Sequence, residues 1–296
     1  MGSTASTQLK ILRSRELSRL PWLSHGFSTR LGGVSSAYGG NTLNLGFTSH
    51  DSRSAVERNR ELFVENLDSE YGSRNLPDWS LVGVRQIHSD VIYRIDRVPG
   101  EILAGDGLVT ATPGLLLAVL TADCLPLIVV DKKRRAAGVF HAGWRGTVKR
   151  IAEKGVGELR RNFGSDPADM VAAVGPGIQH CCYEVGGEIW ERFRSQFRYA
   201  DTLFREVKES DQVREKYPLL FLTARAPGHS ELPVKIFLDL VEANRRQLLD
   251  AGLREENIES SFPCTACHTD LLFSHRAEKG VTGRMMAAAG IVRGQR

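Results

Sequence analysis

Short apolar runs alternate along the chain with stretches of helical periodicity. Runs rich in β-branched residues predict strands at residues 81–86, 91–95, 115–120, 127–130, 138–141, 170–174, 219–221 and 234–237. Apolar positions that recur at three- and four-residue steps among charges predict helices at residues 55–66, 147–162, 187–197 and 240–251. Since no internal repeat or linker interrupts it, this pattern predicts an α/β fold of mixed strand order. We expect a single catalytic domain over residues 21–296, preceded by an N-terminal segment, residues 1–20, that is an edge strand or partly flexible.

One strand pair can be predicted down to its register. The apolar runs at 127–131 and 136–141 flank a polar four-residue loop, a length that suits antiparallel pairing. Pairing across this loop places Pro126 opposite His141, with Cys124 at the same end of the hairpin. The thiol and the imidazole should therefore lie near the distance of diagonal neighbours on a sheet.

Composition narrows the class of protein. The chain has 296 residues, of which 42% are hydrophobic and 25% charged, which is enough material for a sizeable core. A net charge of +4, with basic residues spread along the chain, argues against a nucleic-acid partner. Neither a signal-peptide core nor an uninterrupted membrane-length apolar run is present, so we expect a cytoplasmic protein without a membrane partner. Five cysteines, an odd number, indicate reduced thiols free for metal, catalysis or packing.

Three residues at the ends of predicted strands could hold a metal ion: His88, Cys124 and His141. Two imidazoles and a thiolate suit Zn²⁺, and three protein ligands leave a fourth position open for water or substrate. The alternative is that Cys124 packs as a small apolar residue and that both histidines are ordinary hydrogen-bonded side chains. Spacing alone does not decide between the two.

A series of short motifs runs in order through nearly the whole chain. They are His25-Gly26-Phe27-Ser28-Thr29-Arg30, Gly32-Gly33-Val34-Ser35, Asn44-Leu45-Gly46, Gln86-Ile87-His88-Ser89, Thr121-Ala122-Asp123-Cys124, His141-Ala142-Gly143-Trp144-Arg145-Gly146, Gly175-Pro176-Gly177-Ile178, Cys182-Tyr183-Glu184-Val185-Gly186 and Phe273-Ser274-His275-Arg276. In this order they resemble the YfiH/YlmD family, once called multicopper polyphenol oxidases, also called peptidoglycan editing factors, and now regarded as purine nucleoside phosphorylases.

The resemblance implies a metal site, a reaction and a fold. The zinc ligands of that family fall here on His88, Cys124 and His141. The implied reactions are phosphorolysis of adenosine, inosine, guanosine or methylthioadenosine, and zinc-dependent deamination of adenosine. Zinc deaminases with His and Cys ligands carry out comparable chemistry at C6 of adenine. The implied fold is a layered α/β structure in which mixed sheets are sandwiched with helices.

Phosphorolysis needs a phosphate held beside the anomeric carbon of the ribose, which favours arginine donors and glycine-rich turns. Arg30 precedes Gly32-Gly33, and Arg145 precedes Gly146 where a helix is expected to begin. We expect Arg30, Asn44 and Arg145 to contact ribose or phosphate.

Deamination also needs a proton carrier. The carboxylate candidates are Glu184, Asp106 and Asp123, although Asp106 could serve only a turn and Asp123 could only support a ligand. We expect Cys124, His141 and Glu184 to be the catalytic residues.

The remaining cysteines allow two other interpretations. Cys264-Thr265-Ala266-Cys267-His268 matches the pattern of c-type haem attachment, which would make the protein an electron carrier. The same pair could form half of a zinc knuckle, but Cys181 and Cys182 are adjacent and would point in opposite directions on a strand. Packing is the interpretation that the sequence favours for both pairs.

Three further functions compete for the Cys124 site. Cys124 and His141 could form a nucleophile pair of a cysteine hydrolase acting on a peptidoglycan precursor. A binding module could use zinc for folding alone, which would require a closed set of four ligands. A copper polyphenol oxidase would need close metals, typically held by His-x-His pairs, and the eight histidines here form no such pair.

Overall fold

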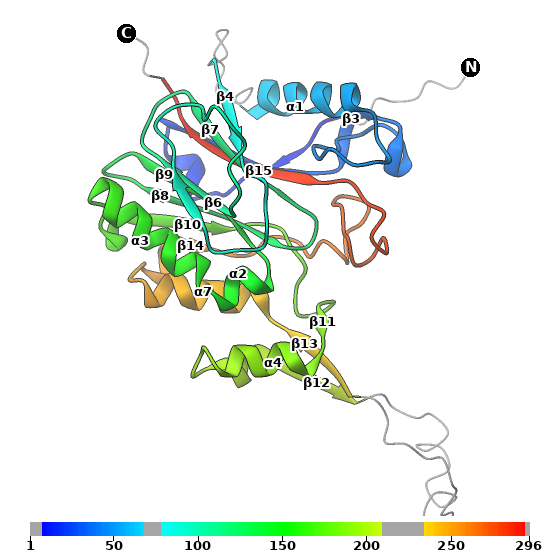
Figure 1. Cartoon of the computed structure of the whole chain (residues 1–296), viewed down its shortest axis with the longest axis vertical. Helices are drawn as coiled ribbons and strands as arrows, with labels where there is room; N and C mark the ends of the chain where they lie inside the picture. The colour runs from blue at the N-terminus through cyan, green and yellow to red at the C-terminus, as the bar shows by residue number, and fades with distance from the viewer. Residues whose placement is uncertain (1–7, 68–77, 209–233, 294–296) are drawn as a thin grey trace, which may run out of the picture. The chain divides into compact units, whose positions relative to one another are not determined.

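The computed structural model describes residues 8–67, 78–208 and 234–293 (Figure 1). Contacts divide the chain into two units: Met1–Gln179 with Leu240–Arg296, and His180–Asp239. The single catalytic domain expected over residues 21–296 stays a prediction. The strand expected at residues 219–221 lies outside the described residues.

The larger unit is built on two mixed sheets. The first has the order β1 (Ile11–Leu12), β2 (Leu23–Ser28), β15 (Met285–Ile291), β7 (Leu115–Thr121) and β4 (Ser80–Gly83). The second has the order β14 (Ile258–Glu259), β10 (Met170–Val174), β8 (Leu125–Asp131), β9 (Ala136–Ala142), β6 (Gly107–Thr110) and β5 (Ile92–Arg94). Because parallel and antiparallel pairs occur in both sheets, the predicted mixed strand order is confirmed.

Alternation along β7 shows how the layers pack. Leu117 and Val119 point into an apolar core shared by the two sheets. Their neighbours Leu116 and Ala118 point the other way and pack with Phe63 of helix α1 (Arg53–Leu67). Because successive side chains of a strand face opposite sides, one buried strand serves two apolar layers.

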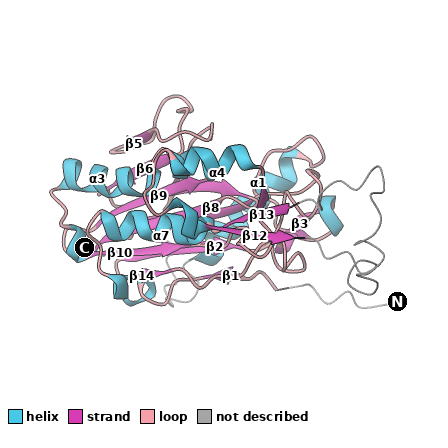
Figure 2. Cartoon of the chain, turned by 90° about the horizontal axis from the view of Figure 1, so that it is seen from below, coloured by secondary structure: helices cyan, strands magenta, loops and turns pink. Residues whose placement is uncertain are grey.

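Helices cover the outer faces of both sheets. Their bounds are α1 (Arg53–Leu67), α2 (Trp144–Val148), α3 (Ile151–Phe163) and α7 (Leu240–Asp250). α1 lies on the side of the five-stranded sheet, and α2, α3 and α7 lie on the side of the six-stranded sheet (Figures 1 and 2). The predicted layered α/β fold is confirmed.

The helix expected at residues 147–162 is wrong in its N-terminal part. Two helices occupy this stretch, because Arg150 adopts a left-handed backbone with φ 64° and separates α2 from α3. The first helix begins at Trp144, with Gly143 between it and the end of β9, and α3 packs against β9.

Short elements complete the described chain. The larger unit also contains β3 (Leu31–Ser35) and the 3₁₀ turns η1 (Leu17–Arg19), η2 (Ala37–Gly39), η4 (Pro167–Asp169) and η6 (Glu255–Asn257). The unit His180–Asp239 contains β11 (Glu184–Val185), α4 (Gly187–Arg194), η5 (Ala200–Leu203), β12 (Phe204–Lys208) and β13 (Val234–Leu238), with β13 as the middle strand of an antiparallel sheet. Within the described ranges, we find no helix long and apolar enough to span a bilayer.

The β8–β9 hairpin has the predicted register. Asp131 pairs with Ala136, and Pro126 pairs with His141. Cys124 directly precedes the first residue of β8, so it lies at the same end of the hairpin as His141.

Candidate metal centre

Three donor groups converge at one end of the two sheets. His88 lies in the loop after β4, Cys124 lies in the loop between β7 and β8, and His141 belongs to β9. Their donor atoms lie within 4.8 Å of one another. The distance from Cys124 Sγ to His88 Nε2 is 4.0 Å, and the two imidazole centroids are 5.0 Å apart. The structure therefore brings together the three residues that the sequence singled out.

Asp106 organises two of the three donor residues. Its buried carboxylate accepts a hydrogen bond of 2.8 Å from Nδ1 of His141. The same group accepts hydrogen bonds from the backbone N–H of Ile87, His88 and Ser89 and from the Ser89 hydroxyl. One carboxylate thus fixes the loop of His88 and leaves Nε2 of His141 as the free nitrogen.

Gln86 is a second organiser, which the sequence identified only as part of a motif. Its side-chain amide donates to the carbonyl of Leu120 at 2.7 Å and accepts from the Leu120 N–H at 2.8 Å. The side chain thereby takes the place of a strand residue beside the end of β7. This bond pair holds the His88 loop next to the loop of Cys124.

The backbone around the donors allows a close approach. His88 has φ 55°, in the left-handed region that few non-glycine residues adopt. At Gly143, a Cβ atom would lie 2.8 Å from Cys124 Sγ and 3.3 Å from His88 Cδ2. Only glycine leaves room there for the thiol and the imidazole to meet.

Charges couple Cys124, His141 and Asp106. Burial alone would raise the pKa of the Cys124 thiol, but hydrogen bonding and charge from His141 and His88 lower it to about 6. Burial would lower the pKa of His141, but Asp106 and the thiolate raise it to about 9. For Asp106 burial is again outweighed, by His141 and Ser89, and its pKa falls to about 2. The anionic sulfur needed by a metal is therefore already favoured.

The donor set fits a zinc ion. Tetrahedral zinc with one thiolate and imidazole ligands places sulfur and nitrogen about 3.6 Å apart, given its usual bond lengths. The observed distance of 4.0 Å between Cys124 Sγ and His88 Nε2 is close to this value. His88 is exposed whereas His141 is 4% exposed, so one side of the group faces solvent. Three ligands with an open side are typical of a catalytic zinc site rather than of a closed structural one.

The carboxylate candidates for proton transfer differ in their surroundings. Asp106 is fully buried with both oxygens bonded, and Asp123 accepts bonds on both oxygens from Thr265, Ser274 and Arg276. Glu184 lies exposed in β11 of the unit His180–Asp239. Asp106 and Asp123 therefore hold the site together.

The expected substrate contacts lie in three different environments. The Arg30 guanidinium donates to the carbonyls of Thr269 and Tyr38 and pairs with Glu278 at 3.1 Å. Asn44 is fully buried, and its amide bonds to backbone and side-chain groups of the chain itself. Arg145 is exposed at the start of α2, with its guanidinium 4.5 Å from the Trp144 ring centroid. Contact of these residues with a substrate stays a prediction.

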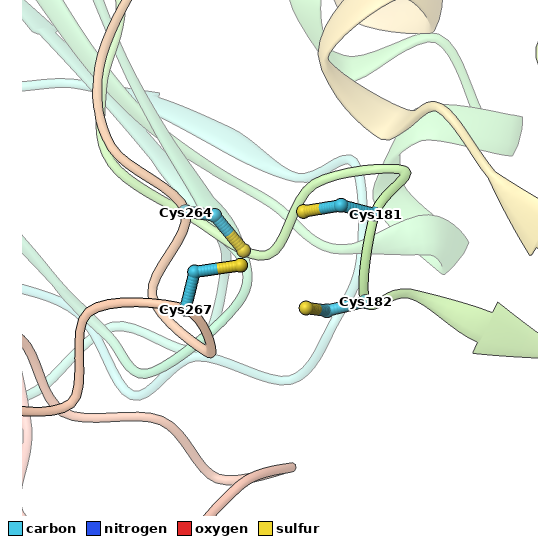
Figure 3. Close-up of side chains that lie close together, drawn as sticks. All are labelled: Cys181, Cys182, Cys264 and Cys267. Carbon is cyan, nitrogen blue, oxygen red and sulfur yellow. The ribbon is translucent and has the colours of Figure 1, made fainter.

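The remaining cysteines occupy turns. Cys264 is buried and accepts a hydrogen bond from the Gln179 N–H, while Cys267 is exposed; their sulfur atoms lie within 4.8 Å of each other and end side by side in Figure 3. Cys181 and Cys182 precede β11 in a turn, so the expectation of opposite directions on a strand is wrong, and Figure 3 shows both side chains on the same side of their loop.

Comparisons with known proteins show what the chain is similar to. Residues 24–292 match the family model described as multi-copper polyphenol oxidoreductase laccase. The chain is 33% identical to purine nucleoside phosphorylase YlmD of Bacillus subtilis over 90% of its own length and 87% of that protein. It is 35% identical to adenosine deaminase RL5 of an unknown prokaryotic organism, over 66% of this chain and 69% of that protein. The crystal structure of Bacillus licheniformis hypothetical protein YfiH superposes with a TM-score of 0.76 at 32% identity, covering 97% of both chains.

Proposed function

The chain belongs to the family described as multi-copper polyphenol oxidoreductase laccase, and on that basis we propose that it is a zinc-dependent purine nucleoside phosphorylase that also deaminates adenosine. Its substrates would be phosphate together with adenosine, inosine, guanosine or methylthioadenosine, in the cytoplasm. The observation that carries the proposal is the convergence of His88, Cys124 and His141 around an open side.

Zinc suits this site better than copper. The donors are two imidazoles and one thiolate on three separate strand ends, which hold a single ion. A multicopper site needs many histidines close together, and no His-x-His pair exists among the eight in this sequence. Bound zinc would supply Lewis-acid chemistry next to the substrate.

The surrounding residues would set the state of the ligands. Asp106 accepts the Nδ1 proton of His141 and so keeps Nε2 directed at the metal position. The lowered pKa of Cys124 favours a thiolate at neutral pH. Both features are built into the chain before any metal binds.

Substrate handling would fall to the residues that the sequence predicts for it. Arg145 is the most accessible of the expected arginines, because the guanidinium of Arg30 is already held by Glu278. In phosphorolysis an oxygen of phosphate bonds to the anomeric carbon as the bond to the base breaks. We assign the proton transfers to Glu184, and ribose or phosphate contacts to Arg30, Asn44 and Arg145, as the sequence predicts.

Two measurements together test the proposal. Elemental analysis of protein purified without added metal should find one zinc per chain. Chromatography of inosine incubated with the protein should show hypoxanthine only when phosphate is present, and adenosine should also give inosine. Zinc with base release that does not depend on phosphate would refute phosphorolysis.

A cysteine hydrolase is the second candidate, favoured by the Cys124 sulfur and a His141 ring nitrogen lying within 4.8 Å of each other. It predicts activity that survives removal of metal by a chelator, and a covalent acyl adduct on Cys124. The zinc proposal predicts that the chelator abolishes activity and that added zinc restores it. Mass spectrometry of the chelated protein incubated with a peptidoglycan precursor separates these outcomes.

A further inference from the structure

Asp123 binds a part of the chain that is distant in sequence. Its Oδ1 accepts hydrogen bonds from the hydroxyls of Thr265 at 2.6 Å and Ser274 at 2.7 Å. Its Oδ2 accepts from the backbone N–H of Arg276 at 2.6 Å. The residue is 8% exposed and directly precedes Cys124. One nearly buried carboxylate thus joins two turns of the C-terminal segment to the loop of a metal ligand.

The backbone of the same residue is held as well. Asp123 has φ 91°, a left-handed conformation, and its carbonyl accepts a hydrogen bond of 2.8 Å from the Ile178 N–H. The neighbouring Gly177 carbonyl accepts from the Thr265 N–H at 3.1 Å. The three segments around Asp123, Gly177 and Thr265 therefore form one closed set of hydrogen bonds.

Within this set of hydrogen bonds, those to the charged carboxylate of Asp123 contribute most to stability. Hydrogen bonds to an ionised acceptor are roughly twice as strong as neutral ones. Removing the charge leaves buried hydroxyls without their acceptor, which costs about 1–3 kcal/mol for each unsatisfied group. A strained backbone such as that of Asp123 persists only where its surroundings hold it in place.

We propose that Asp123 is a positioning residue that clamps the C-terminal segment, residues 265–276, against the Cys124 loop and thereby fixes the Cys124 sulfur relative to His88 and His141. The role in metal binding rests on the proposed zinc centre, whereas the clamp itself does not. Residues that orient a ligand typically affect metal affinity by about 10–100-fold.

Asp123→Asn is the informative substitution. Asparagine has the same size and adopts left-handed backbone readily, so the variant changes the carboxylate and little else. We expect the zinc Kd, measured by competition with a chelator, to rise at least about tenfold. We also expect the thiolate-to-metal band of the cobalt-substituted protein to weaken, because the sulfur moves relative to the imidazoles.

Asp131→Asn is the matched control. Like Asp123, Asp131 is a buried acid. It is the last residue of β8, at the end of that strand away from Cys124, and it accepts hydrogen bonds from the backbone N–H groups of Lys133 and Arg134. Its removal should leave the zinc Kd within about twofold of the wild type, since it does not orient a ligand. If Asp123→Asn does not fold, the pair Thr265→Val and Ser274→Ala removes two donors and should weaken zinc binding in the same direction.

A metal-free readout separates the clamp from the zinc proposal. In the metal-free protein, hydrogen exchange at the amides of Arg276 and Ala277 should accelerate in Asp123→Asn and not in Asp131→Asn. Unchanged exchange there would overturn the clamp, and an unchanged zinc Kd in a folded Asp123→Asn protein would overturn its role in fixing the Cys124 sulfur. If the wild type binds no zinc, but exchange is still faster in Asp123→Asn than in the wild type, the proposed function is refuted and the clamp is retained.

Discussion

His25 is a buried histidine that lies outside the candidate metal centre. It lies in β2 with no exposed surface, and its Nε2 accepts a hydrogen bond of 3.1 Å from the Ser14 N–H. Burial and then the charge of Arg13 lower the pKa of His25 from 6.5 to about 4. The ring is therefore neutral in the folded protein at neutral pH.

This histidine should make folding stability depend on pH. The unfolded chain binds a proton near pH 6.5 and the folded chain only near pH 4, so the stabilisation is complete above pH 6.5. As the pH falls from 6.5 to about 4, the free energy of unfolding should drop by about 3 kcal/mol. Urea denaturation at a series of pH values measures this drop. The drop should be much smaller in His25→Gln, whereas His50→Gln, a variant at an exposed histidine, should show the same drop as the wild type. An equal drop in the wild type and both variants would exclude His25 as the cause.

Asp106 should govern metal affinity without touching the metal. In Asp106→Asn the side chain keeps its size but loses the charge that faces His141 and the His88 loop. We expect the zinc Kd to rise by about 10–100-fold. Chelator competition measures the change, with Asp169→Asn, a partner of Lys133 at the surface, as the control. Equal affinities in the two variants would show that the carboxylate does not orient the ligands.

At the scale of elements, the contact between α3 and β9 depends on one missing side chain. A Cβ on Gly155 would lie 2.6 Å from the Phe140 ring, which is fully buried in β9. Gly157, two residues further along α3, has open space around it. Glycine is therefore required for packing at the first position and lowers helix stability at the second.

The two glycines should respond in opposite directions to alanine. Gly155→Ala overpacks the contact with Phe140 and should reduce the free energy of unfolding by about 1–3 kcal/mol. Gly157→Ala gains helix propensity and should raise it by about 0.5–1 kcal/mol. Urea denaturation of both variants at neutral pH gives the values. Stabilisation by both substitutions would mean that the helix shifts freely over the sheet.

Some elements could be predicted from the sequence and others could not. The register of the β8–β9 hairpin could be predicted because both strands are rich in apolar and β-branched residues and a short polar loop joins them. β15 was missed because its run Met-Met-Ala-Ala-Ala-Gly-Ile lacks β-branched residues until its end. β2 was missed because its six buried residues include two serines and a histidine. Both are neighbours in the middle of their sheet, where packing overrides local preference.

In the candidate site, too, some residues can be predicted from the sequence and others cannot. Hairpin register alone places Cys124 near His141, because the pairing is local. His88 reaches them through Gln86 and Asp106, contacts between segments far apart in sequence that no periodicity reveals. The sequence alone offers His88 as one possible ligand at a strand end, the family resemblance joins it to the other two, and the structure places it beside them.

At the scale of the whole fold, the candidate metal centre depends on the stacking of two sheets. β4 and β7 belong to the five-stranded sheet, and β8 and β9 belong to the six-stranded one. Cys124 lies where the chain crosses from β7 to β8, and His88 and His141 approach it from either sheet. Metal binding should therefore stabilise the pairing of the sheets as well as the site.

Removal of metal should lower the overall stability. A ligand at one hundred times its Kd stabilises the folded state by about 2.7 kcal/mol. We expect a chelator to lower the unfolding midpoint of the wild type and to leave that of His88→Ala nearly unchanged. Thermal denaturation with and without chelator measures both. The same shift in both proteins would show that the metal binds elsewhere.

The proposed zinc centre is tested most directly by comparing the wild type with Cys124→Ala, both prepared in the same way without added metal. Elemental analysis and the phosphate-dependent release of hypoxanthine from inosine are measured on the same samples. We expect one zinc per chain and phosphate-dependent release in the wild type, with both lost in Cys124→Ala. A Cys124→Ala protein that keeps its zinc and its phosphorolysis would contradict the proposed zinc centre.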